Sequence, residues 1–398
     1  MNTGLGRPVR LLYLIDSLFP GGAARSLSAV APYLVGEGVQ LEVAYLFERP
    51  GLHAEFASAG VRVFPLTGPS RGRRWARAVR LVRRRRPDLI HTTLFEADIA
   101  GRVAGLLGGA PTVCSLVGLP YGHEQLQDPS LIGWKVRAAR AVDATTARSV
   151  RRFHALSSHV ADVMAARLRV SRERIDVVPR GRDPARLGLR TDRRREEARR
   201  RLGVRPEQVV VLAAARQEFQ KGLDILMDGF PRISESVPHA QLFLCGRDGA
   251  ATPKLREKAA RLGKRVTMLG PRNDVFELMC AADALAVPSR WEPLGGVLLE
   301  ALALETPIVA SDLPAVRELL DLGRYGRLVP PERPEALAEG IVAAVNDREG
   351  SARMARLGRA RFLETYTVDR VGQQMVDFYR RALAPRTREP SAKLRRSA

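Results

Sequence analysis

The sequence predicts an α/β protein with two Rossmann-like domains whose parallel sheets face each other across a cleft. Short apolar runs alternate with segments of helical periodicity along almost the whole chain, and this alternation is typical of βαβ units. The 398 residues suffice for two domains of ordinary size. A polar, arginine-rich segment without an apolar run lies between residues 179 and 209, so we place the domain boundary near residue 185.

Seven apolar runs before this boundary and six after it have the length and composition of buried strands. Ligands of parallel sheets bind at the carboxyl ends of the strands, so these ends locate the candidate residues. The expected strands are Val9–Ile15, Leu41–Phe47, Val61–Pro65, Leu89–His91, Pro111–Leu116, Phe153–Ser157, Ile175–Pro179, Val209–Ala215, Gln241–Cys245, Arg265–Leu269, Ala284–Val287, Pro307–Ala310 and Arg327–Val329. The expected helices lie near residues 23–36, 73–86, 97–107, 131–149 and 159–168, and at Val297–Leu304 and Val368–Leu383.

The composition bounds the function and the compartment. The net charge is +22, mostly from arginine, which suits nucleic acid, anionic lipid or a phosphorylated substrate, unless the arginines are merely spread over solvated faces. No apolar run reaches the length of about 18 residues that a membrane span needs, and we see no signal peptide. The cysteines lie far apart and match neither a metal site nor a disulfide framework, so we expect a cytoplasmic protein.

The stretch after the predicted strand Ala284–Val287 carries two acids around a glycine pair. Glu292 lies in the loop, Gly295 and Gly296 precede a predicted helix, and Glu300 lies on that helix. The free backbone N–H groups of a helix start favour an anion, and glycines let a ligand approach the backbone. Because carboxylates accept hydrogen bonds from hydroxyls, this arrangement suits a diphosphate between two hydroxyl-rich rings. Solvated acids beside an ordinary turn are the simpler alternative.

Two further loops have the chemistry of an anion site. Arg216 follows a predicted buried strand and Lys221 begins the next helix, so both can reach one diphosphate and stabilise the charge that grows on a leaving group. Gly21 and Gly22 lie between the first strand and the first helix, which carries Arg25. Surface cations and a common turn are the alternatives for these two loops.

These motifs resemble those of the retaining glycosyltransferases of family 4, also called glycosyl transferases group 1, which have the GT-B fold. The resemblance rests on the E-x7-E spacing of Glu292 and Glu300 and on the R-x4-K-G pattern from Arg216 to Gly222. It implies a nucleoside-diphosphate sugar as donor and a hydroxyl group as acceptor. The implied catalytic residues are Arg216, Lys221 and Glu292, and the implied donor-binding residues are Gly22, Arg216, Lys221, Glu292, Leu294, Gly295, Gly296 and Glu300.

The resemblance also divides the chain by role. Residues 1–185 would form the acceptor-binding domain and residues 186–365 the sugar-nucleotide-binding domain. A helix over residues 366–384 would cross back to the first domain, and residues 385–398 would form a charged, disordered tail. On the acceptor side we place Gly21, Arg25, His91, which is expected at the carboxyl end of its strand, and His123.

The sequence departs from the family pattern at several positions. Many members have a histidine after the strand that corresponds to Pro111–Leu116, and here only His123, in a following loop, could replace it. Arg180 and Arg182 interrupt a segment that usually reads Pro-Asn-Gly-Val-Asp. Ala24 stands where an acid is often found.

The sequence therefore predicts a retaining, metal-independent glycosyltransferase without a cofactor, moving a hexosyl or N-acetylhexosaminyl unit from a donor such as a UDP-sugar. The chain contains no Asp-x-Asp motif, and the cations and the helix start would neutralise the diphosphate. The acceptor is an envelope or lipid-linked glycan intermediate or a secondary metabolite such as an aminocyclitol. Two alternatives are a sugar-nucleotide epimerase on the same fold and a non-catalytic protein that binds nucleic acid or membranes.

One segment could bind a membrane surface. Residues 71–86 contain nine arginines and no acid, and Trp75, Val79 and Val82 form one apolar stripe. An anionic membrane or a lipid-phosphate acceptor would suit this helix. We favour the alternative that the stripe packs on the sheet, because a strand follows directly. We expect no nucleic acid as partner.

Overall fold

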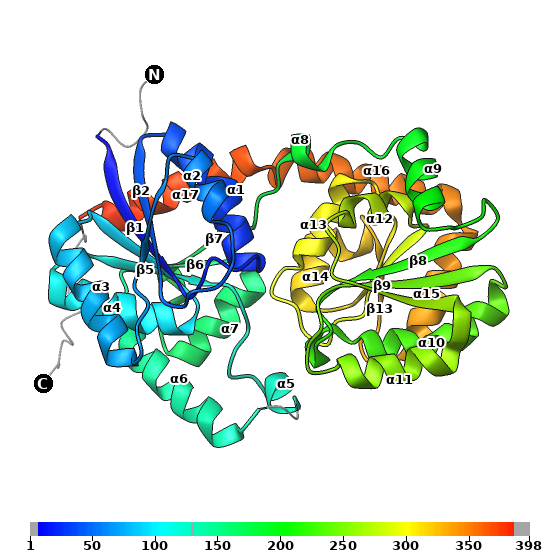
Figure 1. The fold of residues 1–398 in the computed structure, drawn as a ribbon, viewed down its shortest axis with the longest axis horizontal. Coiled ribbons are helices and arrows are strands. Elements are labelled where there is room, and N and C mark those ends of the chain that lie inside the picture. Colours follow the sequence, from blue (N-terminus) through cyan, green and yellow to red (C-terminus); the bar gives the residue numbers. More distant parts are fainter. Residues whose placement is uncertain (1–6, 129–130, 386–398) are drawn as a thin grey trace, which may run out of the picture.

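Two parallel sheets form the centres of two domains, which Figure 1 shows side by side. The computed structural model describes residues 7–128 and 131–385. The first sheet has the order β3-β2-β1-β4-β5-β6-β7 and the second has the order β10-β9-β8-β11-β12-β13. The strands are β1 Val9–Ile15, β2 Val39–Tyr45, β3 Arg62–Pro65, β4 Leu89–Thr93, β5 Thr112–Leu116, β6 Arg152–Ala155, β7 Ile175–Val177, β8 Val209–Ala214, β9 Ala240–Cys245, β10 Val266–Gly270, β11 Ala284–Val287, β12 Ile308–Ser311 and β13 Arg327–Val329.

Helices connect the strands and cover both sheets (Figure 1). In the first half they are α1 Gly22–Gly36, α2 His53–Ser58, α3 Arg71–Arg85, α4 Phe95–Gly108, α5 His123–Leu126, α6 Gly133–Ala147 and α7 Ser158–Leu168. In the second half they are α8 Pro184–Leu187, α9 Asp192–Arg201, α10 Leu223–Ser236, α11 Thr252–Leu262, α12 Val275–Ala281, α13 Gly296–Ala303, α14 Pro314–Leu319, α15 Pro334–Asn346, α16 Arg348–Thr365 and α17 Val368–Leu383. The 3₁₀ turns of the described residues are η1 Arg172–Arg174, η2 Phe219–Lys221, η3 Gly263–Arg265 and η4 Asp321–Gly323.

The architecture confirms the predicted fold class, and every predicted strand is present within a few residues of its expected place. One predicted boundary is wrong in a way that matters for the site. The strand expected to end at His91 continues to Thr93, so His91 lies inside β4. Thr92 and Thr93 interrupt the apolar run, yet they are 0% and 1% exposed. They remain in the strand because the Thr92 hydroxyl donates to Asp98, at 2.6 Å, and the Thr93 hydroxyl pairs with that of Tyr13.

Within the described residues the chain passes between the domains twice, and the two crossings pair with each other. The segment after β7 leads to α8 in the second domain, and α17 returns from α16 along the first domain (Figure 1). Arg182 on the first crossing forms a parallel bridge with Thr367 on the second. The Arg182 N–H donates to the Tyr366 carbonyl and the Val368 N–H donates to the Arg182 carbonyl, each at 2.9 Å.

A buried polar network fixes α17 on the first sheet. The ring of His91 bonds through Nδ1 to the hydroxyl of Tyr379 on α17, at 2.8 Å, and through Nε2 to Ser115, at 2.7 Å. Ser115 in turn contacts Nδ1 of His154 at 2.8 Å. Burial lowers the pKa of His91 well below its usual value and lowers the pKa of His154 to about 4, so both rings stay neutral at pH 7.

The arginine-rich helix α3 covers the first sheet. Val82 is 1% exposed, and Trp75 and Val79 pack against the apolar side chains beneath them. Arg71 pairs with Glu96 on α4, and Arg85 pairs with Glu42 on β2. The apolar stripe is therefore part of the core, as we favoured from the sequence. No helix in the described ranges has both the length and the apolarity that crossing a bilayer requires.

Candidate functional site

Two glycine-containing loops, one from each domain, meet beside the first crossing. One follows β1 and leads to α1, whose N-cap is Gly21, and the other follows β11 and leads to α13, whose N-cap is Gly295. Neither helix start has a side-chain cap or an acid in its first turn. Both loops therefore present free backbone N–H groups at the carboxyl ends of parallel strands, where an anion is favoured.

Lys221 and Glu292 form an ion pair in the second domain. Lys221 Nζ lies 2.5 Å from Glu292 Oε2, and the Ser289 hydroxyl donates to the same oxygen at 3.2 Å. Glu292 is only 5% exposed. The loop that carries Lys221 approaches the loop that carries Glu292 closely, and this approach depends on Gly222. Gly222 has φ +60°, and a Cβ at this position would collide with the Pro288 carbonyl. The pair places an ammonium and a carboxylate together next to the start of α13.

Glu300 on α13 is paired with Arg182 on the first crossing. Arg182 Nε donates to Glu300 Oε1 at 2.8 Å, and the two side chains are 15% and 19% exposed. Arg182 also approaches the α13 start, because a Cβ on Gly296 would lie 2.7 Å from Arg182 Nη2. Glu300, which the family resemblance assigns to donor binding, is therefore already paired with a cation from the interdomain segment.

Arg180 lies between the two glycine loops. A Cβ on Gly22 would collide with its guanidinium, and a Cβ on Gly296 would lie 4.0 Å from its Nη1. Burial, together with the like charge of Arg182, lowers the pKa of Arg180 to about 10, while Glu292 and Glu300 act in the opposite direction. Arg180 is thus within electrostatic reach of both predicted acids.

Arg216 belongs to a second group of cations at the same boundary. Burial lowers the pKa of Arg247, and the like charges of Arg216 and Arg25 lower it further, so the three guanidinium groups lie near one another. Arg247 in the second domain also stacks on the ring of Phe19 in the first, with 4.4 Å to the ring centroid. Arg216 and Arg25 are exposed. Three cations gathered in this way are well placed to share one anion.

The described structure does not place every predicted residue at this region. The expectation that His91 faces an acceptor is not supported, since both ring nitrogens are occupied inside the core and the residue is 1% exposed. The side chain of His123, at the start of α5, and the predicted tail beyond residue 385 lie outside the described part of the structure. Leu294 is 4% exposed, so its side chain is not available to a ligand.

The sequence did not identify Arg180, Arg182 or Arg247 as functional candidates. A signal for Arg247 was present, because it follows the end of a buried strand in the second domain just as Arg216 does. The only signal for Arg180 and Arg182 was that they depart from the family pattern in the interdomain segment.

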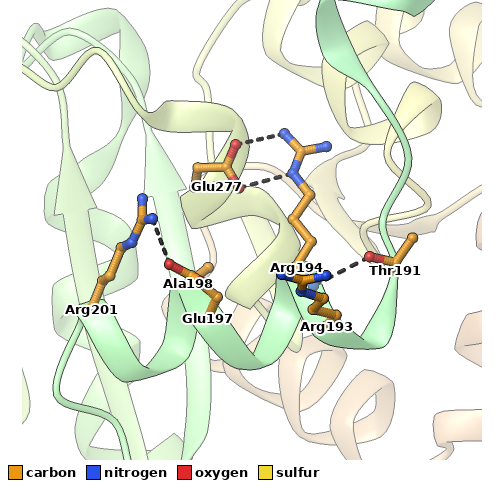
Figure 2. A pocket seen from close by; sticks show the side chains of 7 residues that line it. All are labelled: Thr191, Arg193, Arg194, Glu197, Ala198, Arg201 and Glu277. Carbon is orange, nitrogen blue, oxygen red and sulfur yellow. Dashed lines mark hydrogen bonds and ion pairs between the residues drawn. The ribbon is translucent and has the colours of Figure 1, made fainter.

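A pocket elsewhere on the second domain is a less suitable site. Figure 2 shows its lining, which comes from α9 and α12 and includes Arg194 and Glu277. The Arg194 guanidinium donates to both oxygens of Glu277, at 2.8 and 2.7 Å, so the charges of this pair satisfy each other. The described residues also contain no group of three or more His, Cys, Asp or Glu side chains arranged to hold a metal ion.

Two segments of the chain match descriptions of glycosyltransferases. Residues 20–186 match the family described as Glycosyltransferase Family 4, and residues 194–361 match the family described as Glycosyl transferases group 1. The chain is 30% identical to the 2-deoxystreptamine N-acetyl-D-glucosaminyltransferase of Streptomyces fradiae over 75% of this chain and 72% of that protein. It is 29% identical to the alpha-maltose-1-phosphate synthase of Mycolicibacterium smegmatis over 74% of this chain and 79% of that enzyme.

Other similarities cover part of a relative or only the fold. The alpha-D-kanosaminyltransferase of Streptomyces kanamyceticus is 30% identical, but the match spans 48% of this chain and half, 50%, of that protein. The structure of HepE from Anabaena in complex with UDP and glucose superposes with a TM-score of 0.82 at 24% identity, covering 93% of this chain and 99% of that one. Its likeness therefore supports the two-domain fold.

We expect Lys221→Met to lower the free energy of unfolding by about 3 kcal/mol, because it leaves the Glu292 carboxylate buried without its cation. Urea unfolding measures this loss. The double variant Lys221→Met/Glu292→Gln removes the stranded charge and is expected to regain most of the stability. Lys258→Met is the control, since its partner Asp228 is 48% exposed and the loss there is expected to stay below about 1 kcal/mol. Equal losses in the single and double variants would contradict the pairing.

Proposed function

We propose a function from the premise that this chain belongs to glycosyltransferase family 4, also called glycosyl transferases group 1. It transfers a hexosyl or N-acetylhexosaminyl unit from a nucleoside-diphosphate sugar to a hydroxyl group. The observation that carries the proposal is the meeting of two uncapped helix starts, Lys221, Glu292 and Glu300 at the domain boundary. This set supplies hydrogen-bond donors and positive charge for a diphosphate and carboxylates for sugar hydroxyls.

In the proposed reaction the cations act on the leaving group. Arg216 and Lys221 would stabilise the negative charge that grows on the nucleoside diphosphate as the anomeric carbon–oxygen bond breaks. Glu300 would accept hydrogen bonds from the ribose, and Glu292, held by Lys221 and Ser289, would accept one from the transferred sugar. Backbone N–H groups of Gly295 and Gly296 would contact the diphosphate.

We propose that the transfer retains the anomeric configuration and needs no metal ion. The acceptor oxygen would bond to the anomeric carbon on the face that the diphosphate leaves, and a phosphate oxygen would take the acceptor proton. Support comes from family membership and from the number of cations around the glycine loops, which can replace a metal in neutralising the diphosphate.

The acceptor is proposed to be a glycan intermediate or a small metabolite such as an aminocyclitol. The second possibility draws on the Streptomyces fradiae relative, which is a 2-deoxystreptamine N-acetyl-D-glucosaminyltransferase. None of the relatives named above is an epimerase or a nucleic-acid-binding protein. The alternatives considered from the sequence therefore gain no support.

We expect at least one of UDP-, GDP- or dTDP-linked sugars to raise the melting temperature of the protein and to be hydrolysed slowly. Stabilisation is about 2.7 kcal/mol when the ligand is at 100 times its dissociation constant. Glu300→Ala and Lys221→Ala are expected to lose most of this response, measured against each variant's own ligand-free melting temperature. Glu339→Ala, which changes an acid that is 61% exposed, is the control. An undiminished response in both site variants would refute the assigned roles.

We expect the product to have the same anomeric configuration as the donor, and the rate to be unchanged by EDTA. Proton NMR of the isolated glycoside reads the configuration, and a coupled assay for nucleoside diphosphate reads the rate. An inverted product would refute retention. Loss of activity in EDTA that added Mg²⁺ or Mn²⁺ restores would refute metal independence.

We also propose a cytoplasmic location with peripheral contact to an anionic membrane through the outer face of α3. Arg73, Arg77, Arg80 and Arg84 on that face are exposed. Each basic residue near an anionic surface contributes about 1 kcal/mol, so we expect binding to vesicles rich in phosphatidylserine at low salt and a large loss in the four-fold Arg→Gln variant. Phosphatidylcholine vesicles are the control in a co-sedimentation assay. Equal binding of variant and wild type would end this part of the proposal.

A further inference from the structure

Arg180 differs from its neighbour Arg182 in having no partner. Within residues 7–128 and 131–385 the guanidinium of Arg180 makes no hydrogen bond or ion pair, although the side chain is partly buried. Arg182, two residues along, donates to Glu300 and to the carbonyl of Gly181. A guanidinium carries five N–H donors in a fixed planar arrangement, so Arg180 has a full set of unused donors.

A desolvated cation without a counter-ion costs free energy, and proteins rarely keep one without use. The two nearest acids do not compensate Arg180 directly, because Glu292 is bonded to Lys221 and Glu300 is bonded to Arg182. Even with its pKa lowered to about 10, Arg180 stays charged at pH 7. An anion that pairs with Arg180 would therefore come from outside the described chain.

The position of the guanidinium defines where such an anion would lie. Arg180 occupies the space beside Gly22 in the first domain and approaches Gly296 in the second. Both glycines stand at the first turn of an uncapped helix. An oxyanion at this point would receive hydrogen bonds from Arg180 and from backbone N–H groups of one or both helix starts.

We propose that Arg180 is a substrate-binding residue that pairs with an oxyanion, a phosphate or a carboxylate, held between the two glycine loops. The inference rests on the proposed function, since it places this anion on a substrate of the transfer. Two sources have the same chemistry, namely the diphosphate of the donor and an acidic group on the acceptor. Arg180 thereby provides a recognition residue for an anionic group at a position where the family usually has asparagine.

The test compares Arg180→Gln with Arg186→Gln. Arg186 is exposed on α8 in the same interdomain segment, so both variants remove one positive charge from that segment. Pyrophosphate represents the donor diphosphate, and inorganic phosphate added to protein saturated with pyrophosphate represents a second anion from the acceptor. Isothermal titration calorimetry measures both affinities. Arg180→Lys, which keeps the charge but loses the planar donor set, serves as the second variant.

If the donor supplies the anion, pyrophosphate binds Arg180→Gln about tenfold or more weakly than it binds Arg186→Gln. If the acceptor supplies it, pyrophosphate affinity is retained and binding of the additional phosphate is lost. Arg180→Lys is expected to lose part of the affinity that Arg180→Gln loses, for the same anion. Without ligand, Arg180→Gln is expected to unfold at the same temperature as the wild type or above it. Both affinities equal to those of Arg186→Gln would overturn the inference.

This outcome can be separated from failure of the proposed function. Neither probe contains a nucleoside or a sugar, so the anion test is readable even if no nucleotide sugar binds. If wild-type protein binds a nucleotide sugar and Arg180→Gln matches Arg186→Gln with both probes, only the role of Arg180 fails.

Discussion

The pairing of the two interdomain crossings is the constraint on which the site depends. The bridge between Arg182 and Thr367 ties the segment after β7 to the segment before α17. Because α17 is itself fixed to the first sheet through Tyr379 and His91, the interdomain segment has little freedom to move away from the domain boundary. Arg180 and Arg182 are therefore held where the loops before α1 and α13 approach each other, and the site is completed by residues that belong to neither loop.

The strands were predictable because strands of a parallel sheet covered on both faces are continuous apolar runs. The same rule failed at β4, where buried threonines continue the strand by bonding to Asp98 and Tyr13. A polar residue stops an apolar pattern in the sequence, but a satisfied hydroxyl does not stop a strand in the structure. As a result His91, which we expected at the carboxyl end of its strand, lies within β4 and is buried in the core.

The site was predictable only as far as its loops carried known patterns. The order of Arg216, Lys221, Glu292 and Glu300 along the chain assigned them to one region, but their partners depend on tertiary geometry. Lys221 pairs with Glu292 across the second domain's loops, whereas Glu300 pairs with Arg182 from outside that domain. No spacing rule relates residues that are 71 or 118 positions apart, as the members of these two pairs are. Arg180 could be recognised as unusual in the sequence, but its contact with Gly22 could not.

The arginine content explains why an unpaired arginine is informative. With 65 lysine and arginine residues, the presence of a cation at any position carries little meaning, and many have structural partners. Arg190 and Arg195 donate to the Ala282 carbonyl at the end of α12, at 2.8 and 3.1 Å, where a positive charge is favoured by the helix dipole. Exposed arginines without a protein partner are solvated by water. The case for Arg180 therefore comes from three features together: partial burial, no partner within the described chain, and a place between two helix starts that have no side-chain cap.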